Sequence, residues 1–579
     1  MASTNCSSSP TRILLDEDLS GPLYGLPAIG VDFHRLIAAG LQARKADLPV
    51  LRRHFELELL SMRAVWNANL SIHTLPAEIL LDIFKYLLVP SYQQRYTHAA
   101  PRRPWVPLMG VCRHWCALIR NDAEFWSTID ISKGTKSMSW LDLTLRRSRR
   151  APLRVTISRG CDIKAAIPIL QQHTDHIKEL EVSAPNAGWI KALFIHRLPI
   201  LANLTVNLDQ HVAYGRPRRN VDFVNRNICP CLEELSLLRY GLTWTAPLLA
   251  NLQFLSLSDC ALSTEPLSFT AFLDVLEHGQ ELRSLQLGSF LFVVLSSQTS
   301  VPPGRLVTLP KLSYLGFHAL PDIAARLMSH LRILGTCDFE LMGECSSTNP
   351  SITYASFLPR NAPLVCLTPF VSFVSLQVCR EVHVITWNLP PGGTFMLELY
   401  RASRARWDHT WLESGLQQLP SLFALRGAGL THLNIAGALA AVSSATWDMI
   451  FDSFPTLEIL DFEVQAGSAF PTAIIRSLSV PVTAPGRAAR KDGVDGLYGV
   501  RCPALADLNF MMDEGWKWTP SAVENVLTCL RARAARGAPQ LQCLRVSPRL
   551  DIMAGAGLEH IWEGLRQKLR ASVELLRES

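Results

Sequence analysis

A six-residue pattern, P-x-L-x-x-L, recurs along this chain of 579 residues and restricts the folds that it can adopt. Proline ends a preceding helix, and the leucines that follow face a buried core from a short strand. Six full matches are more than a leucine-rich composition alone explains. They begin at Pro199, Pro230, Pro310, Pro455, Pro503 and Pro539, and related segments without the proline begin at Leu252 and Leu282.

Apolar helical segments precede several of these strands, so the repeating element is a helix followed by a strand. One such element cannot bury its own leucines, and stacked neighbours share a continuous core. Strands joined through helices lie parallel, which predicts a curved, right-handed α/β array. The predicted helices are 221–228, 269–279, 446–454 and 519–535; residues 127–132 form a strand, and 138–158 form a helix, a break at Pro152 and a strand.

The end of the chain and three interruptions of the array have their own predictions. Leu558, Ile561, Trp562, Leu565 and Leu569 recur at helical spacing, so residues 557–579 are expected to form a helix that caps the last strand. Surface loops rich in Gly, Pro and Ser are predicted at residues 296–305, 342–363 and 481–499.

The composition supports extensive cores but not a nucleic-acid binder. Hydrophobic residues make up 48% of the chain and charged residues 18%, as in globular proteins. The length exceeds one ordinary core, so several domains or one elongated array are expected. The net charge of +6 is small for this length, and nucleic acid is not an expected partner.

Export and membrane insertion are not expected. The N-terminal residues lack a basic start followed by an apolar core, and each long uncharged run is interrupted by polar residues, Gly or Pro. Fourteen cysteines are dispersed through the chain, as free thiols would be in a reducing compartment. The sequence therefore predicts a cytosolic or nuclear protein. Residues 1–32 are expected to lack fixed structure.

Residues 33–73 are predicted to form an amphipathic helix. An apolar stripe at a spacing of three or four residues includes Leu48, Leu51, Phe55, Leu59, Met62 and Trp66. The stripe could pair with another chain as a coiled coil. Pro49 and the small number of clean heptads favour packing on the neighbouring domain.

The next segment, residues 74–127, carries more apolar surface than a unit of its size can bury. Its first helix, LPAEILLDIFKYLL (75–88), begins with Pro76 in the first turn and spreads apolar side chains over most of its circumference. Its second part, VCRHWCALIRNDAEFW (111–126), repeats the theme. Units near 50 residues are marginal even when well packed, so this surplus favours contact with a partner over burial within the chain.

These two segments together resemble an F-box, from which the chain departs by a long connection over residues 89–107. The resemblance implies docking on the Skp-type adaptor of a cullin–RING ubiquitin ligase. The residues that match adaptor-contacting positions are Leu75, Pro76, Ile79, Leu80, Ile83, Phe84 and Leu87. Those that match positions in the F-box core are Val111, Trp115 and Trp126.

The array that follows resembles the degenerate leucine-rich repeats that accompany F-boxes in many eukaryotic proteins, including large fungal sets. The predicted fold class is α+β: a small all-helical F-box unit at 74–127, then an irregular α/β leucine-rich-repeat-like solenoid at 128–579. The resemblance implies that the array binds a protein substrate. Its leucines face inward, which leaves alternate strand residues as candidate substrate contacts: Glu234, Ser236, Ser284, Gln286, Asp461, Asp507, Asn509 and Arg545.

Signatures of catalysis are absent from the sequence. It contains no G-x-S-x-G, P-loop, G-x-G-x-x-G or H-E-x-x-H motif, and neither an enzyme nor a cofactor is predicted. Cys112, His114 and Cys116 lack a second ligand pair nearby, so core thiols are favoured over a zinc site. The same holds for Cys229 and Cys231.

The sequence leaves two interpretations of the function of the whole chain, and it favours one interpretation of the basic cluster. The first is a substrate-recognition adaptor of a ubiquitin ligase; the second is an F-box scaffold that is not coupled to degradation. The arginines at 146–150 are interpreted as an exposed helix end, which is favoured over a nuclear-entry signal.

Overall fold

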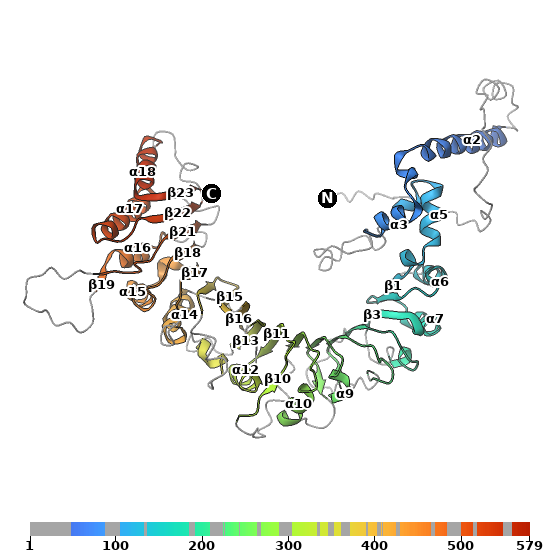
Figure 1. Cartoon of the computed structure of the whole chain (residues 1–579), viewed down its shortest axis with the longest axis horizontal. Helices are drawn as coiled ribbons and strands as arrows, with labels where there is room; N and C mark the ends of the chain where they lie inside the picture. Colours follow the sequence, from blue (N-terminus) through green and yellow to red (C-terminus); the bar gives the residue numbers. More distant parts are fainter. Residues whose placement is uncertain are drawn as a thin grey trace, which may run out of the picture. The chain divides into compact units, whose positions relative to one another are not determined.

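The computed structural model divides the chain into two compact units, Met1–Phe125 and Trp126–Ser579 (Figure 1). The predicted boundary followed residue 127. The predictions for residues 1–47 and for most of the 89–107 connection lie outside the described residues, as do those for half of 221–228 and for most of 296–305 and 481–499. The described residues 226–228 form a turn, so the helix predicted there is wrong for them. The structure describes residues 48–86, 105–131, 136–184, 191–208, 224, 226–242, 244–262, 268–288, 304–332, 336–345, 353–359, 371–389, 392–401, 407, 409–423, 429–464, 469–482, 499–512, 518–547 and 559–578.

The described part of the first unit is helical. Its central helix α3 begins after Pro76, whose fixed φ suits a helix start, and carries Glu78 in its first turn. The elements are α2 (Leu48–Ala68), η1 (Ser71–Thr74), α3 (Ala77–Lys85), α4 (Val106–Met109), α5 (Arg113–Asn121) and η4 (Ala123–Trp126).

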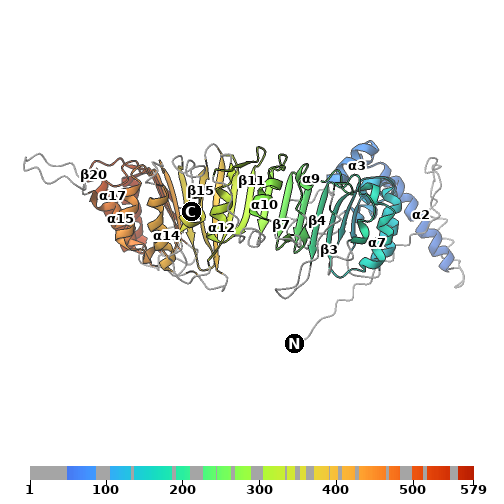
Figure 2. The same cartoon turned by 90° about the horizontal axis from the view of Figure 1, so that it is seen from below.

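The second unit contains one large, mostly parallel sheet of seventeen strands (Figure 2). From β1 to β13, each strand pairs in parallel with the next strand of this sheet along the chain. The strands are β1 (Thr128–Ile131), β2 (Leu153–Ile157), β3 (Ile177–Ala184), β4 (Asn203–Leu208), β5 (Glu234–Leu238), β7 (Phe254–Ser258), β9 (Ser284–Gly288), β11 (Tyr314–Ala319), β13 (Asp338–Cys345), β14 (Phe373–Val378), β15 (His383–Leu389), β16 (Gly393–Arg401), β17 (His432–Gly437), β18 (Ile459–Val464), β21 (Asp507–Met512), β22 (Leu541–Ser547) and β23 (Val573–Glu578).

The parallel order is interrupted at β14, β15 and β16. Their spatial order is β13–β16–β15–β14–β17, and β15 runs antiparallel to both of its neighbours. The reason is the length of the connections: a parallel pair needs a crossover, whereas short links such as 379–382 permit only an antiparallel pair. The Cys379 N–H closes that turn on the Val382 carbonyl at 2.8 Å. The prediction of parallel strands throughout is therefore wrong for β15, while β14 and β16 each keep one parallel neighbour.

The helices of the second unit lie along one face of the sheet (Figure 1). The predicted helices at 269–279, 446–454 and 519–535 are confirmed as α10, α15 and α17, and the helix and strand of 138–158 as α6 and β2. The helices are α6 (Lys136–Ser148), α7 (Ile163–Gln171), α9 (Ala246–Leu249), α10 (Phe269–Leu276), α12 (Pro321–Met328), α14 (His409–Leu422), α15 (Ser444–Ser453), α16 (Thr472–Ser479), α17 (Pro520–Ala535) and α18 (Glu559–Ser572).

The leucines of the P-x-L-x-x-L pattern face these helices, as predicted. The two leucines of each full match are at most 6% exposed. In five of the six matches the first leucine also closes a turn onto the carbonyl three residues earlier, for example from the Leu312 N–H to the Leu309 oxygen at 3.3 Å. The proline is the second residue of this turn; it lacks an N–H and leaves no donor unpaired there.

The predicted loop at 342–363 and the predicted terminal cap at 557–579 need correction. Residues 342–345 belong to β13 and not to a loop, since Phe339 and Leu341 alternate with Glu340 and Met342 as in a strand with one buried face. The C-terminal helix α18 ends at Ser572, and Val573–Glu578 continues as β23, which pairs in parallel with β22. The last helix therefore covers the sheet like its predecessors and is not a terminal cap.

Gly437 is the position in this core where a side chain is least tolerated. Its φ is +146°, and an added Cβ would lie 2.4 Å from the Val378 carbonyl oxygen on the paired strand β14. Gly437→Ala is expected to lower the free energy of unfolding by about 1–3 kcal/mol or more. Urea denaturation measures this loss. Gly429→Ala, with nothing within 4 Å of the new Cβ, is the control that should leave the midpoint in place. Equal midpoints for both variants would contradict the prediction.

Candidate functional site

The inward side of α3 is held by two of its apolar residues. Leu80 is 0% exposed and Phe84 is 3% exposed, four residues apart on one side of the helix. The Phe84 ring packs against Trp115 of α5 with 4.6 Å between the ring centroids. Both residues were predicted to contact a partner. Their burial assigns them to the interior instead, because a residue without accessible surface is not available for docking.

The outward side of α3 presents apolar side chains to solvent. Ile79 and Ile83 are 46% and 44% exposed, and Tyr86 is 79% exposed. Pro76 is also exposed, and Leu75 is half-buried; Leu87 lies outside the described residues. We call Pro76, Ile79, Ile83 and Tyr86 the adaptor face, because three of the predicted adaptor contacts, Pro76, Ile79 and Ile83, lie on it. The sequence signal for separating this face from the interior is the spacing of four between Ile79 and Ile83 and between Leu80 and Phe84.

The three predicted F-box core residues have different environments. Trp115 is half-buried against Phe84. Val111 is 54% exposed, because it lies in the turn before Cys112, the N-cap of α5. Trp126 is buried in the second unit, where its ring lies 5.7 Å from Trp140. The assignment of Val111 to a buried core is therefore wrong, whereas Trp126 is buried and packs on α6.

Two further aromatic residues stabilise the first unit, and the sequence prediction missed one of them, Trp105. Trp105 is 4% exposed and Phe125 is 0% exposed, and their rings meet edge to face at 6.3 Å. Trp105 was placed in the connection 89–107, where no helical periodicity marks a buried position. Phe125 belongs to the predicted segment 111–126, and its buried ring closes the described part of the first unit.

An ion-pair network joins the end of α3 to the end of α5. Lys85 Nζ lies 2.7 Å from Glu124 Oε2 and 3.3 Å from Asp122 Oδ2. The hydrogen bond to Glu124 raises the pKa of Lys85 above its usual value, so the ammonium is retained at neutral pH. Lys85 also lies in the last turn of α3, where a cation is favoured by the helix dipole. The network links the last turn of α3 to the residues that follow α5.

At the start of α5, Cys112 caps the helix and contacts a histidine. Cys112 Sγ accepts the Trp115 N–H at 3.5 Å and lies 3.8 Å from His73 Nε2. Burial lowers the pKa of His114, which favours its neutral form. No group of three or more His, Cys, Asp or Glu side chains within the described ranges could hold a metal ion.

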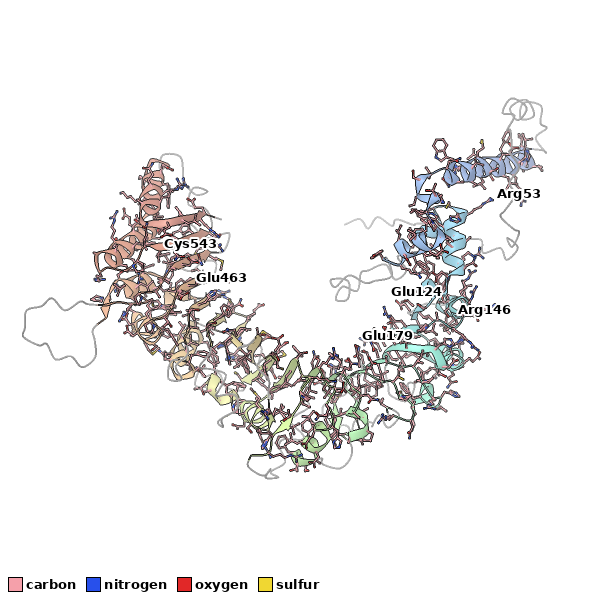
Figure 3. All side chains as sticks on the ribbon, in the orientation of Figure 1. Arg53, Glu124, Arg146, Glu179, Glu463 and Cys543 are labelled. Atoms are coloured by element: carbon pink, nitrogen blue, oxygen red, sulfur yellow. The ribbon has the colours of Figure 1, made fainter. Side chains whose placement is uncertain are left out.

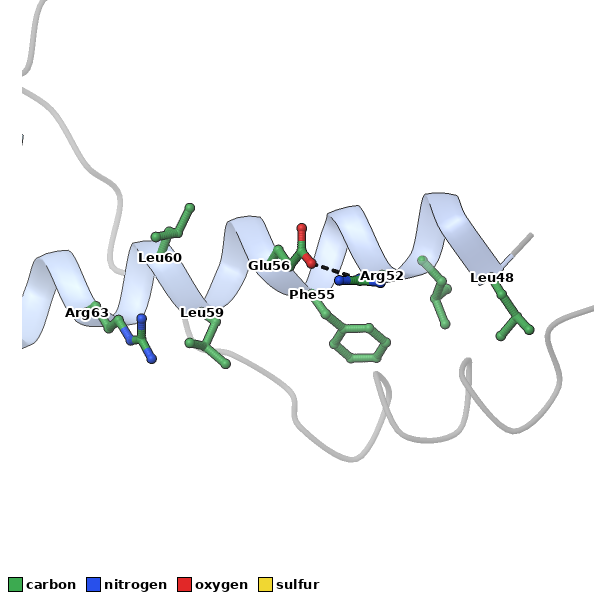
Figure 4. Close-up of a pocket in the computed structure, with 8 residues that line it drawn as sticks. Leu48, Arg52, Phe55, Glu56, Leu59, Leu60 and Arg63 are labelled. Atoms are coloured by element: carbon green, nitrogen blue, oxygen red, sulfur yellow. Dashed lines mark hydrogen bonds and ion pairs between the residues drawn. The ribbon is translucent and has the colours of Figure 1, made fainter. Parts of the chain in front are cut away.

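The long helix α2 has none of its described side chains buried. A shallow pocket is lined by eight α2 residues, from Leu48 to Arg63, with an Arg52–Glu56 ion pair across it (Figure 4). The prediction that this helix packs on its neighbour therefore finds no support among the described residues. The described walls of the pocket come from one helix, and no polar groups converge on it from a second element.

The eight predicted substrate contacts all lie on the face of the sheet opposite the helices, and Figure 3 labels Glu463 and Cys543 on the same face. The register places Asp461, Asn509 and Arg545 side by side on β18, β21 and β22. Asp461 accepts hydrogen bonds from Asn509 Nδ2 at 2.5 Å and from His432 Nε2 at 2.6 Å. Ser236, Ser284 and Gln286 lie on β5 and β9, which are separated from β18 by the strands β11 to β17. Substrate binding by these residues stays a prediction.

A second group on the same face was missed by the sequence prediction. It includes Glu340 and Glu344 on β13, Glu398 and Tyr400 on β16, and Tyr314 on β11. The P-x-L-x-x-L pattern does not extend to β13 or β16, and part of β13 was assigned to a loop. Their alternation of buried and accessible residues was the available signal.

A buried histidine lies on the helix side of the same region. His383 is 2% exposed; its Nε2 lies 2.7 Å from the Tyr354 hydroxyl and its ring 4.8 Å from Trp407. Burial lowers its pKa to about 3, so the folded protein holds it neutral over the physiological range.

This histidine is expected to make the protein less stable in mild acid. Below the unfolded pKa of about 6.5 the unfolded chain binds a proton that the folded chain excludes, which costs about 1.4 kcal/mol of stability per pH unit down to pH 5. His383→Gln should flatten the fall in unfolding free energy between pH 7 and pH 5, measured by urea denaturation. Parallel pH profiles for the native chain and the variant would contradict the assignment.

Comparison with known protein families gives a match for the segment that follows α2 and ends just after β1. Residues 72–132 match the family model described as F-box-like, which covers η1, α3, α4, α5, η4 and β1. The match supports an F-box protein, and an F-box domain implies a Skp-type adaptor as partner. No curated protein matches the chain. No described helix combines the length and apolarity needed to cross a membrane.

Proposed function

We propose that this protein is the substrate-recognition adaptor of a Skp–cullin–F-box ubiquitin ligase. The observation that carries the proposal is the adaptor face: the F-box-like domain holds Ile79 and Ile83 in solvent on a helix whose opposite side is fixed by Leu80 and Phe84. Exposed isoleucines at this spacing favour a protein partner, since burying each one stabilises a complex by roughly 1.5–3 kcal/mol.

The second unit is proposed to be a degenerate leucine-rich-repeat array that holds a protein substrate on its sheet face. It catalyses no bond chemistry and needs no cofactor. Its role is to raise the concentration of the substrate next to a ubiquitin-charged enzyme. The proposed compartment is the cytosol or nucleus. The fourteen dispersed cysteines support it, since those among the described residues are free thiols.

The proposal is tested by affinity purification of the intact chain beside a Leu75→Ala/Pro76→Ala variant. The intact chain should retrieve the Skp-type adaptor and the cullin, and the variant should lose both while it keeps partners bound to the second unit. Proteasome inhibition should then raise the level of at least one of these partners. A retrieved adaptor with no partner responding to the inhibitor would favour a scaffold that is not coupled to degradation.

A further inference from the structure

The face of the sheet opposite the helices has a strongly biased charge. Across twelve strands, from β4 to β21, its outward-facing positions carry no lysine and no arginine. Over the same strands they carry eight acidic residues: Glu234, Asp338, Glu340, Glu344, Glu398, Asp461, Glu463 and Asp507. The whole chain has a net charge of +6, so the acidic character of this face is a local segregation and not a consequence of composition.

Half of these acidic residues lie on two adjacent strands. Asp338, Glu340 and Glu344 are on β13, and Glu398 on β16 aligns with Met342 between them. Paired strands lie about 4.8 Å apart, so Glu398 is within reach of the same ligand as its neighbours on β13. None of the four forms an ion pair with a residue that the structure describes. Their negative charge is therefore not neutralised within the described chain.

Aromatic and methionine side chains surround these carboxylates. The Tyr314 hydroxyl donates to Glu340 at 2.5 Å, and the Tyr400 hydroxyl lies 3.4 Å from Glu344. Tyr314 reaches Glu340 because Gly316 lies between them: a Cβ there would be 2.9 Å from the hydroxyl oxygen. Met342 is 36% exposed beside them. We call Tyr314, Glu340, Met342, Glu344, Glu398 and Tyr400 the acidic patch.

We propose that the acidic patch binds an arginine- or lysine-rich segment of a protein substrate. The carboxylates complement the cationic groups, and the tyrosine rings and methionine contact their aliphatic stems and planar heads. This inference rests on the proposed function, because it assigns a chemical class to the substrate of the second unit. A polynucleotide, as a polyanion, would be repelled by the same carboxylates.

Binding of two labelled twelve-residue peptides to the intact chain tests the inference by fluorescence anisotropy. One peptide contains four arginines spaced by serine, and the other has glutamate in place of each arginine. The arginine peptide should bind, more weakly at 300 mM salt than at 50 mM, and the glutamate peptide should not. Equal binding of both peptides, or binding of single-stranded polynucleotide in place of the arginine peptide, would overturn the inference.

Two matched triple variants test whether the arginine peptide binds at the acidic patch. E340Q/E344Q/E398Q should lower the affinity for the arginine peptide about tenfold or more, since three charge pairs are lost. E56Q/D322N/E524Q removes the same charge from exposed helical positions and should bind as the native chain does. Equal loss in both variants would contradict a local site. Both variants should keep full affinity for the Skp-type adaptor, so failure of the patch and failure of the proposed function give different results.

Discussion

Ile79→Asp/Ile83→Asp is expected to lower the affinity of the chain for a purified Skp-type adaptor at least about 100-fold. Each isoleucine loses roughly 1.5–3 kcal/mol of burial in the complex, and about 1.4 kcal/mol corresponds to tenfold in the dissociation constant. The new carboxylates add a desolvation cost. Both side chains are close to half exposed in the free chain, so its fold should persist. Calorimetric titration measures the affinity and circular dichroism the fold.

The control for this variant is Glu56→Gln, in the same unit but on α2, with a side chain that is exposed to solvent. It should bind the adaptor as tightly as the native chain, because no apolar contact is removed. Leu80→Asp is a useful contrast: it places a charge in the interior and should unfold the first unit. Native affinity in the Ile79→Asp/Ile83→Asp variant would show that the adaptor face is wrongly assigned.

Arg533→Met is expected to reduce the free energy of unfolding by about 2–6 kcal/mol. Arg533 is 3% exposed, and its guanidinium donates to the carbonyls of Arg501 and Cys502 at 2.6 and 2.9 Å. Each of these buried carbonyls would lose a donor, at a cost of roughly 1–3 kcal/mol. The same bonds hold the turn in which Cys502 has a φ of +45°, an uncommon backbone conformation for a residue other than glycine.

The loss should propagate through Arg501 to the neighbouring helices. Arg501 is 7% exposed and binds Asp448 and Asp452 of α15 and the Ser477 carbonyl of α16, with 2.8 Å from its Nε to Asp452. Arg531→Met, an exposed residue on the same helix α17, is the matched control and should leave the urea midpoint unchanged. Equal midpoints for Arg533→Met and the native chain would contradict this account of the turn.

The repeated parts of the fold could be predicted from the sequence. The leucines after Pro230, Pro310 and Pro455 are buried as the pattern predicts, since one local rule places each of them toward the helices. The prediction failed at β14, β15 and β16, where strand order depends on the length of the links. Periodicity in a single strand reports which residues are buried and carries no information on which strand pairs with it.

The adaptor face and the acidic patch could be predicted from the sequence to different degrees. Helical spacing places Ile79 with Ile83 and Leu80 with Phe84, but it does not say which pair faces the interior; the position of Trp115 on α5 decides that. The acidic patch depends on Glu398 lying beside β13, more than fifty residues away along the chain. That proximity follows from the reversed order of β14 to β16, which no local pattern encodes.

The central claim is that the first unit docks on a Skp-type adaptor, and titration of the purified full-length chain with that adaptor tests it most directly. The account predicts saturable binding of one adaptor per chain, with a heat-capacity change below zero as apolar surface is buried. Absence of binding at adaptor concentrations of about 100 μM, with a chain that is folded by circular dichroism, would contradict it, because that limit corresponds to less than about 5.5 kcal/mol of association.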